Sequence, residues 1–311
     1  SCESPFTELK QAYINNGTGW VANSSWKPPY CFVETGLVDI GTRLADVNGD
    51  GAVDLLRSNW AAPDSCDNPT TKKAFINNAN QSFLLSRVKN NLGGSISIEY
   101  KKSTSLNNTG NDATGDLGFN LWVVSRITRY NGMTGSANVT FSYSYNYSGG
   151  LYDYQDKELR GFNSSQETRP DGAKIVRYFH QDDARSGREY KTEILNSSNN
   201  VLYRRRALVW NHTATANLTF VTELRNEETY AFDSQTANPR ITNVSYSYDG
   251  FGNLLQRNFS GDVNLIGDER YETFQYVPNT ALWIVDKPIR YLLTSNNNTL
   301  MKETNYSYDG L

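Results

Sequence analysis

The chain has 311 residues, which is enough for about two domains or for one large β structure. Thirty basic and 33 acidic residues give a net charge of -3, and no basic stripe emerges, so the sequence does not favour binding to nucleic acid or to an anionic membrane surface. Apolar runs such as Leu121–Val124 are too short to insert into a bilayer.

The three cysteines, Cys2, Cys31 and Cys66, lie near the N-terminus. An oxidising compartment would allow one disulfide, for which we expect Cys31–Cys66, and would leave Cys2 for a partner outside the chain. Three buried thiols are the alternative. The chain opens without an initiating Met or a signal-peptide pattern, so we expect a cut or mature N-terminus.

Asn-x-Ser/Thr sequons are abundant and favour a glycosylated protein that is secreted or displayed at the cell surface. An Asn- and Ser-rich set of strands would also raise their number. The fourteen sequons are at Asn16, Asn23, Asn80, Asn107, Asn138, Asn146, Asn163, Asn196, Asn211, Asn217, Asn243, Asn258, Asn297 and Asn305.

Alternation of apolar and polar residues dominates the chain and predicts half-buried antiparallel strands. In "NVTFSYSYNYS" it places Tyr143, Tyr145 and Tyr147 on one face. "SISIEY", "NVSYSYDG" and "NYSYDG" repeat the pattern with Ile96, Ile98 and Tyr100, with Val244, Tyr246 and Tyr248, and with Tyr306 and Tyr308. No long window has a helical period, so we expect few and short helices in an all-β fold.

Turn signals separate these segments and are typical of hairpins. They occur at Gly93-Gly94, Asn131-Gly132, Gly149-Gly150, Pro170-Asp171-Gly172 and Asp249-Gly250. The polar, Gly-rich stretch Leu106–Gly118 predicts a long exposed loop. Because cysteines stop and Tyr-rich hairpins begin near residue 90, we expect two regions, 1–89 and 90–311. Tyr-Ser-Tyr-Asp-Gly recurs at the end, which indicates an array that continues beyond residue 311.

The stretch "LADVNGDGAVDLL" is the strongest candidate for a binding site. Oxygen ligands for a hard cation would come from Asp46, Asn48, Asp50 and Asp54 and from the carbonyl of Ala52. Gly49 and Gly51 supply the backbone freedom to wrap an ion. An EF-hand needs Glu where Arg57 stands, so the motif predicts a calcium site in a strand–loop–strand setting. A solvated acidic turn is the alternative.

At these residues the N-terminal region resembles an FG-GAP or VCBS repeat, the blade unit of integrin-like β-propellers. The likeness rests on "INNGTGW" (14–20), on "DIGTRLADVNGDGAVDLL" (39–56) and on "FINNANQSF" (75–83). In that family the DxNxDGxxD loop binds calcium between two strands.

Downstream, the chain resembles Rhs/YD-repeat proteins of the SpvB and TcB type. The motifs are "NNLGGSISIEYKKST" (90–104), "LWVVSRITRYNG" (121–132), "YSGGLYDYQDKELRGF" (147–162), "YFHQDDARSGREYKTEI" (178–194) and "YDGFGNLL" (248–255). The resemblance implies a spiralling antiparallel β shell that encloses a C-terminal toxin, while teneurins are similar shells used in adhesion. The sequons depart from the bacterial pattern.

Catalytic interpretations are weaker. "FHQDD" places His180 beside Asp182 and Asp183, yet no nucleophile motif or second ligand-spaced histidine accompanies them. The resemblance implies a structural hairpin in which arginines such as Arg185 or Arg188 pair with these acids. The three acids of residues 153–162 suggest a glycosidase pair, but neighbouring Lys157 and Arg160 favour a salt-bridged strand edge. "RRR" at 204–206 favours a solvated strand end.

We therefore expect a non-enzymatic segment of a secreted or cell-surface shell, stabilised by calcium, that encapsulates an effector. Its partners would be the rest of its own chain or co-assembled shell subunits, with the effector inside. The alternative is a glycosylated adhesion or coat protein that binds a cell-surface receptor. A hydrolase that uses Asp182 and Asp183 is the third hypothesis.

If calcium neutralises the loop carboxylates, Asp50→Ala should lower the melting temperature in calcium and leave it unchanged in chelator. Differential scanning calorimetry of both proteins, with calcium and with chelator, measures this. Equal melting of the unmodified chain in the two buffers would count against the site.

Overall fold

The computed structural model describes residues 11–34, 38–39, 41–58, 72–77, 84–110, 116–198, 201–215, 219–232 and 237–309. Within these ranges the protein is all-β, as predicted. The helical elements there are three single 3-10 turns, η1 (Ser24–Trp26), η2 (Ser103–Ser105) and η3 (Gly135–Ala137). A search of the same ranges finds no helix with the length and apolarity needed to traverse a membrane.

The chain divides into two compact units. The first comprises Ser1–Leu84 and Phe119–Trp122, and the second comprises Leu85–Gly118 and Val123–Leu311. The first unit ends a few residues before the predicted boundary at residue 89, and strand β8 (Arg87–Lys89) pairs within the second unit.

The first unit contains three small antiparallel sheets, ordered β1-β2, β3-β4 and β5-β6-β7. Their strands are β1 (Tyr13–Asn15), β2 (Trp20–Ala22), β3 (Val33–Glu34), β4 (Val38–Asp39), β5 (Thr42–Ala45), β6 (Asp54–Ser58) and β7 (Lys72–Phe75). The acidic loop connects β5 to β6, so the strand–loop–strand setting predicted for it is confirmed.

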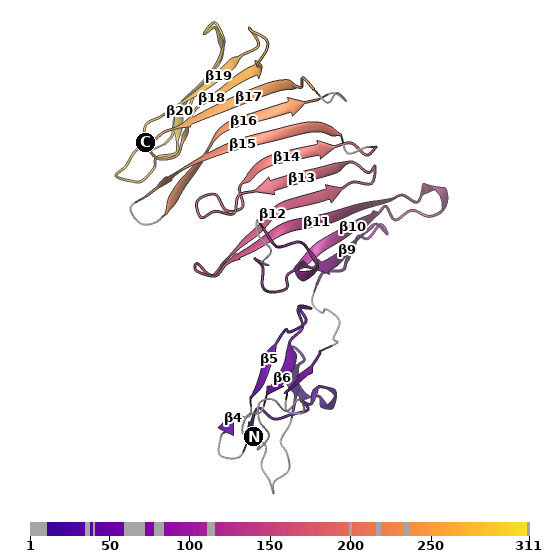
Figure 1. Ribbon diagram of the computed structural model, residues 1–311. Coiled ribbons are helices and arrows are strands. Elements are labelled where there is room, and N and C mark those ends of the chain that lie inside the picture. The colour runs from indigo at the N-terminus through magenta and orange to yellow at the C-terminus, as the bar shows by residue number, and fades with distance from the viewer. Residues whose placement is uncertain are drawn as a thin grey trace. The chain divides into compact units, whose positions relative to one another are not determined.

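The second unit is built on one sheet of fourteen strands that follow each other in chain order, from β8 to β21 (Figure 1). The strands pair antiparallel, as in β11–β12, β15–β16 and β19–β20. Beyond β8, the strands are β9 (Ser95–Lys102), β10 (Trp122–Tyr130), β11 (Thr140–Asp153), β12 (Glu158–Thr168), β13 (Lys174–Phe179), β14 (Glu189–Leu195), β15 (Leu202–Ala214), β16 (Phe220–Ala231), β17 (Arg240–Tyr248), β18 (Leu254–Asp262), β19 (Arg270–Tyr276), β20 (Pro288–Ser295) and β21 (Leu300–Asn305).

The register explains why the alternating sequence forms this sheet. Tyr145 lies opposite Glu167, and Tyr147 lies opposite Ser165. Alternate residues of a strand project from the same face, so the tyrosines of β11 share a face as predicted. The residues directly opposite them on β12 project from that face too.

Few side chains of this sheet are fully buried. Among the described residues the buried apolar side chains are Leu117, Ile175 and Leu208. Side chains on neighbouring strands instead contact each other in pairs. For example, Arg205 forms an ion pair with Glu193 at 3.0 Å. Most strand residues are half-buried, a pattern typical of a sheet that has no second layer packed on it.

Two expectations were wrong, one about β11 and one about the 106–118 segment. Gly149 and Gly150 lie inside the strand rather than in a turn, and parts of the 106–118 segment are buried rather than exposed. Both differences arise because the 106–118 segment lies directly against β11. Gly149 N–H donates to the Asn107 carbonyl at 2.8 Å, and Gly150 N–H donates to Asn108 Oδ1 at 3.2 Å. The other four turn signals lie between strands, as predicted.

The C-terminal tyrosines also differ from the prediction. Tyr306 and Tyr308 lie beyond the end of β21, not in a strand. Tyr306 N–H still donates to the Ile289 carbonyl at 2.9 Å, beyond the last strand residue, Asn305. Tyr308 instead donates its hydroxyl to the Pro288 carbonyl at 2.8 Å.

Gly150 sets the spacing between the 106–118 segment and β11. A Cβ there would lie 2.8 Å from Asn108 Oδ1 and 2.9 Å from Leu117 Cδ2. Gly150→Ala should therefore reduce the free energy of unfolding by about 1–3 kcal/mol, measured by urea denaturation. Gly250→Ala is the matched control, because a Cβ at Gly250 would meet no atom within 4 Å. Equal effects of the two substitutions would contradict the packing argument.

Candidate functional site

The loop between β5 and β6 is closed by hydrogen bonds from its own backbone. Asp46 accepts the N–H groups of Asp50 (3.0 Å, Oδ1) and Gly51 (2.8 Å, Oδ2). Asp50 Oδ1 accepts the N–H of Ala52 at 2.8 Å, and Asn48 donates to Asp50 Oδ2 at 2.9 Å. These bonds fix the direction of the first three oxygen-bearing side chains along one turn.

Asp54 differs from the other four predicted ligands in its burial and in its hydrogen-bond partners. It is fully buried, and its two oxygens accept the N–H groups of Val47 and Asn77 at 2.9 and 2.8 Å. Buried carboxylates are stable when N–H donors surround them, so Asp54 joins the loop to the residues that follow β7. The carboxylates of Asp46, Asp50 and Asp54 do not converge within 4.8 Å of each other.

The residues present nevertheless fit a hard cation. A carboxylate oxygen that accepts one N–H keeps lone pairs for a metal, so Asp46, Asn48 and Asp50 still offer oxygen ligands. Next to the loop, both polar atoms of the Asn120 amide are buried and have no hydrogen-bond partner in the described ranges. Gly51 has φ +81°, and a Cβ there would lie 2.5 Å from Asn120 Nδ2, so only glycine fits.

Cys31 is disulfide-bonded. Cys2 and Cys66 lie outside the described residues, so the Cys31–Cys66 pairing stays a prediction.

The sequons in the described ranges lie on exposed or half-buried residues, and none of them is buried. The exposed ones are Asn16, Asn107, Asn138, Asn146, Asn163, Asn211, Asn297 and Asn305, and the half-buried ones are Asn23, Asn196, Asn243 and Asn258. Asn80 and Asn217 lie outside the described residues.

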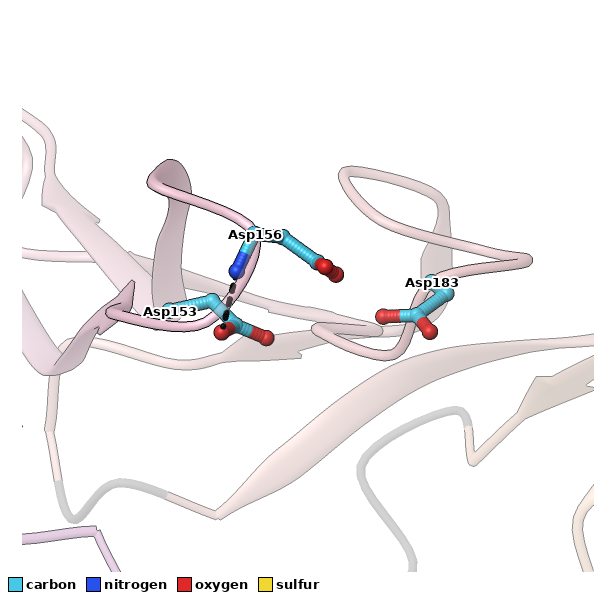
Figure 2. Close-up of side chains that lie close together, drawn as sticks. All are labelled: Asp153, Asp156 and Asp183. Atoms are coloured by element: carbon cyan, nitrogen blue, oxygen red, sulfur yellow. Dashed lines mark hydrogen bonds between the residues drawn. The ribbon is translucent and has the colours of Figure 1, made fainter.

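A second acidic cluster lies in the large sheet. Figure 2 shows the carboxylates of Asp153, Asp156 and Asp183 close together, and one oxygen of each lies within 4.8 Å of the other two. Asp153 is the last residue of β11, and Asp156 lies in the turn that follows, where its N–H donates to Asp153 Oδ1 at 3.1 Å. Asp183 comes from the loop between β13 and β14, so the fold brings two separate loops together.

The guanidinium of Arg160 occupies the centre of this cluster. Arg160 is 6% exposed, and its Nη2 lies 2.7 Å from Asp156, 2.6 Å from Asp183 and 3.5 Å from Asp153. Its Nη1 lies 2.9 Å from Glu158. Because the arginine already supplies the positive charge, the cluster is an ion-pair hub that joins two loops, rather than a place for a metal ion.

The "FHQDD" segment also holds the loop between β13 and β14 against β11 and β12. Gln181 Nε2 donates to the carbonyls of Gly149 and Gly161 at 2.8 and 3.0 Å. Asp182 pairs with Arg185 at 3.0 Å, as the sequence suggested. Burial lowers the pKa of His180, so the imidazole is neutral at pH 7. His180 and Asp182 thus have structural partners on this hairpin, and Asp183 has its partner, Arg160, on β12.

The sequence identified the acids of this junction and the short-range pairs of Arg160, but it missed the bond between Arg160 and Asp183. Twenty-three residues separate the two, and nothing in a local pattern indicates that pairing. Gln181 was missed for the same reason.

Removing the charge at the centre of the hub should destabilise the sheet. Arg160→Gln leaves four carboxylates facing one another, so we expect the melting temperature at pH 7 to fall by roughly 5 °C. Hydrogen bonds from the Asp156 and Gln155 backbone, and then the charge of Arg160, hold the pKa of Asp153 below its ordinary value of 3.8. A lowered pKa adds stability that is complete well above pH 3.8 and is lost as the pH falls through that pKa.

The difference between the unmodified chain and Arg160→Gln should therefore shrink below pH 4, as measured by thermal denaturation from pH 3 to 7. Arg126→Gln, at an exposed residue of β10, is the matched control. A difference that stays constant with pH would contradict the hub.

Comparison with known proteins gives one family. The family described as the insecticide toxin TcdB middle/N-terminal region matches residues 25–193, which is more than half of the chain. No curated protein matches the sequence.

Among solved structures, the chain is similar to the Photorhabdus luminescens Tc holotoxin pore with the TccC3 substitution D651A, at a TM-score of 0.64 and 14% identity. It is also similar to a TcdB2-TccC3-Cdc42 crystal structure, at a TM-score of 0.62 and 16% identity. Both alignments cover 91% of this chain and 18% of the other, so the present chain spans less than a fifth of those proteins. From the match over residues 25–193, the chain belongs to the insecticide toxin TcdB middle/N-terminal region family.

Proposed function

We propose that this chain is a non-enzymatic wall segment of a secreted or cell-surface shell of the Rhs/YD-repeat type, which encloses a C-terminal effector. The observation that carries the proposal is the sheet of fourteen strands in chain order, with few fully buried side chains. A meander of this kind extends a surface instead of closing around its own core, which is what a wall requires.

The related structures support the same role. Their names describe complexes of TcdB2 with TccC3, so a TcdB2-like chain assembles there with a second protein. By analogy, the partners of this chain are the rest of its own polypeptide or a co-assembled shell subunit, together with the enclosed effector.

In this proposal the first unit is an FG-GAP-like module that calcium makes rigid. Asp46, Asn48, Asp50 and Asp54, with the Ala52 carbonyl, are the ligands we assign to it. The strand–loop–strand setting and the buried, unpartnered Asn120 amide beside the loop support the assignment.

A glycosylated adhesion or coat protein is the second candidate. It is favoured by the position of the described sequons, all of which lie outside the buried class. In that case the same wall would present glycans and a receptor-binding surface instead of a cargo space.

Electron microscopy of the intact natural assembly separates the two functions. Encapsulation predicts a closed cage with density inside it, and a protease added to the cage should leave the effector intact. The control is the same digestion after the cage is opened with denaturant, in which the effector should be cleaved. An open lattice or a fibre would overturn the proposal in favour of adhesion.

A further inference from the structure

The three consecutive arginines of β15 have different surroundings. Strand alternation places Arg204 and Arg206 on one face of the sheet and Arg205 on the other. Arg205 pairs with Glu193 at 3.0 Å, and Arg206 bonds both oxygens of Glu227 at 2.6 and 2.9 Å. Arg204 is exposed and makes no hydrogen bond or ion pair with the described residues.

A second arginine of the same kind lies two strands away. Arg204 is directly opposite Ala231 on β16, and Ala231 is directly opposite Arg240 on β17. Arg240 is also exposed and without a hydrogen bond or ion pair among the described residues. The two exposed guanidinium groups therefore flank one small side chain on a single face of the sheet. The charge of Arg204 also adds to the stronger effect of Arg206 in lowering the pKa of Glu227.

Because Ala231 fills little space, a cavity of about 300 Å³ lies between the arginines. It is lined by Tyr203, Arg204, Thr229, Ala231, Arg240 and Thr242, which together we call the arginine notch. Thr229 and Thr242 oppose each other directly and add two hydroxyl groups to the wall. The notch offers hydrogen-bond donors and two positive charges, and none of its described lining residues is a carboxylate.

We propose that the arginine notch binds an acidic polypeptide segment, whose carboxylates pair with Arg204 and Arg240. Guanidinium groups bind carboxylates through two parallel hydrogen bonds, and two exposed arginines at one cavity, neither in an ion pair with a described residue, attract more than one negative group. Neighbouring strands lie about 4.8 Å apart, so the backbones of Arg204 and Arg240 are about 10 Å apart.

An extended peptide places alternate side chains roughly 7 Å apart on one side. Two long arginine side chains can reach both groups of such a pair at once, whereas a single small anion engages only the centre of the notch. An extended acidic segment fits this spacing best. The proposal does not depend on encapsulation, because it rests on the residues of the notch alone.

Fluorescence anisotropy of the full 311-residue chain with a labelled Asp-Gly-Asp-Gly-Asp peptide tests the notch. The peptide should bind at low ionic strength, and a peptide with Asn in place of each Asp should not. Arg204→Gln and Arg240→Gln should each weaken binding by about tenfold, the loss expected for one charged hydrogen-bonding partner. Arg126→Gln removes the same charge from an exposed residue of β10 and should leave binding within about twofold.

Arg204→Lys separates recognition from folding, since lysine keeps the charge but lacks the planar fork. It should bind more weakly than the unmodified chain and more tightly than Arg204→Gln. Equal binding of the Asn peptide, or equal weakening by Arg126→Gln, would overturn the proposal. So would displacement of the peptide by inorganic phosphate at equal concentration, because the notch would then be a small-anion site.

Discussion

Backbone pairing between successive strands is the interaction on which the second unit depends. From β8 to β21 each interior strand is hydrogen-bonded to the strand before it and the strand after it. No α-helix covers the sheet within the described residues, and the buried apolar side chains there are few. The ladder is therefore supported mainly by its own neighbours, and side-chain pairs such as Arg205–Glu193 add to it across the strands.

A single sheet of this length needs elements that tie its loops down. Around β11 and β12 this is done by polar groups rather than by apolar packing. Arg160 joins the β11–β12 turn to the β13–β14 loop, and Gln181 holds the same loop to the carbonyls of Gly149 and Gly161. The register shift between Leu151 and Tyr152 lies in this region. Irregular strand geometry thus coincides with the place where separate segments meet.

The sequence predicted the all-β fold because alternation is a local property. The alternating tyrosines of β11 and of β17 predict these strands from a window of a few residues. Turns such as Asn131-Gly132 are predicted from an equally short window. Gly149-Gly150 misled that reading, since a glycine pair that permits close approach of another segment is identical in sequence to one that forms a turn.

In the candidate sites, too, local features could be predicted from the sequence, whereas contacts between distant segments could not. The spacing of Asp46, Asn48 and Asp50 was enough to predict a tight loop between strands, but not that Asp54 would turn inward to Val47 and Asn77. Likewise, the sequence predicted one solvated strand end for "RRR" at 204–206 and did not distinguish the three arginines. Only the cross-strand register shows that Arg204 shares its surroundings with Arg240, which is thirty-six residues away in sequence, rather than with Arg205.

The scarcity of dry apolar side chains has a thermodynamic consequence. The heat-capacity change of unfolding grows with the apolar surface that becomes hydrated and is reduced by polar surface. Strands whose residues are mostly half-covered and polar at their edges release less apolar area per residue than a layered domain of equal length. The curve of free energy against temperature is consequently shallow for this unit, so that stability changes little over a wide span of temperatures on either side of its maximum.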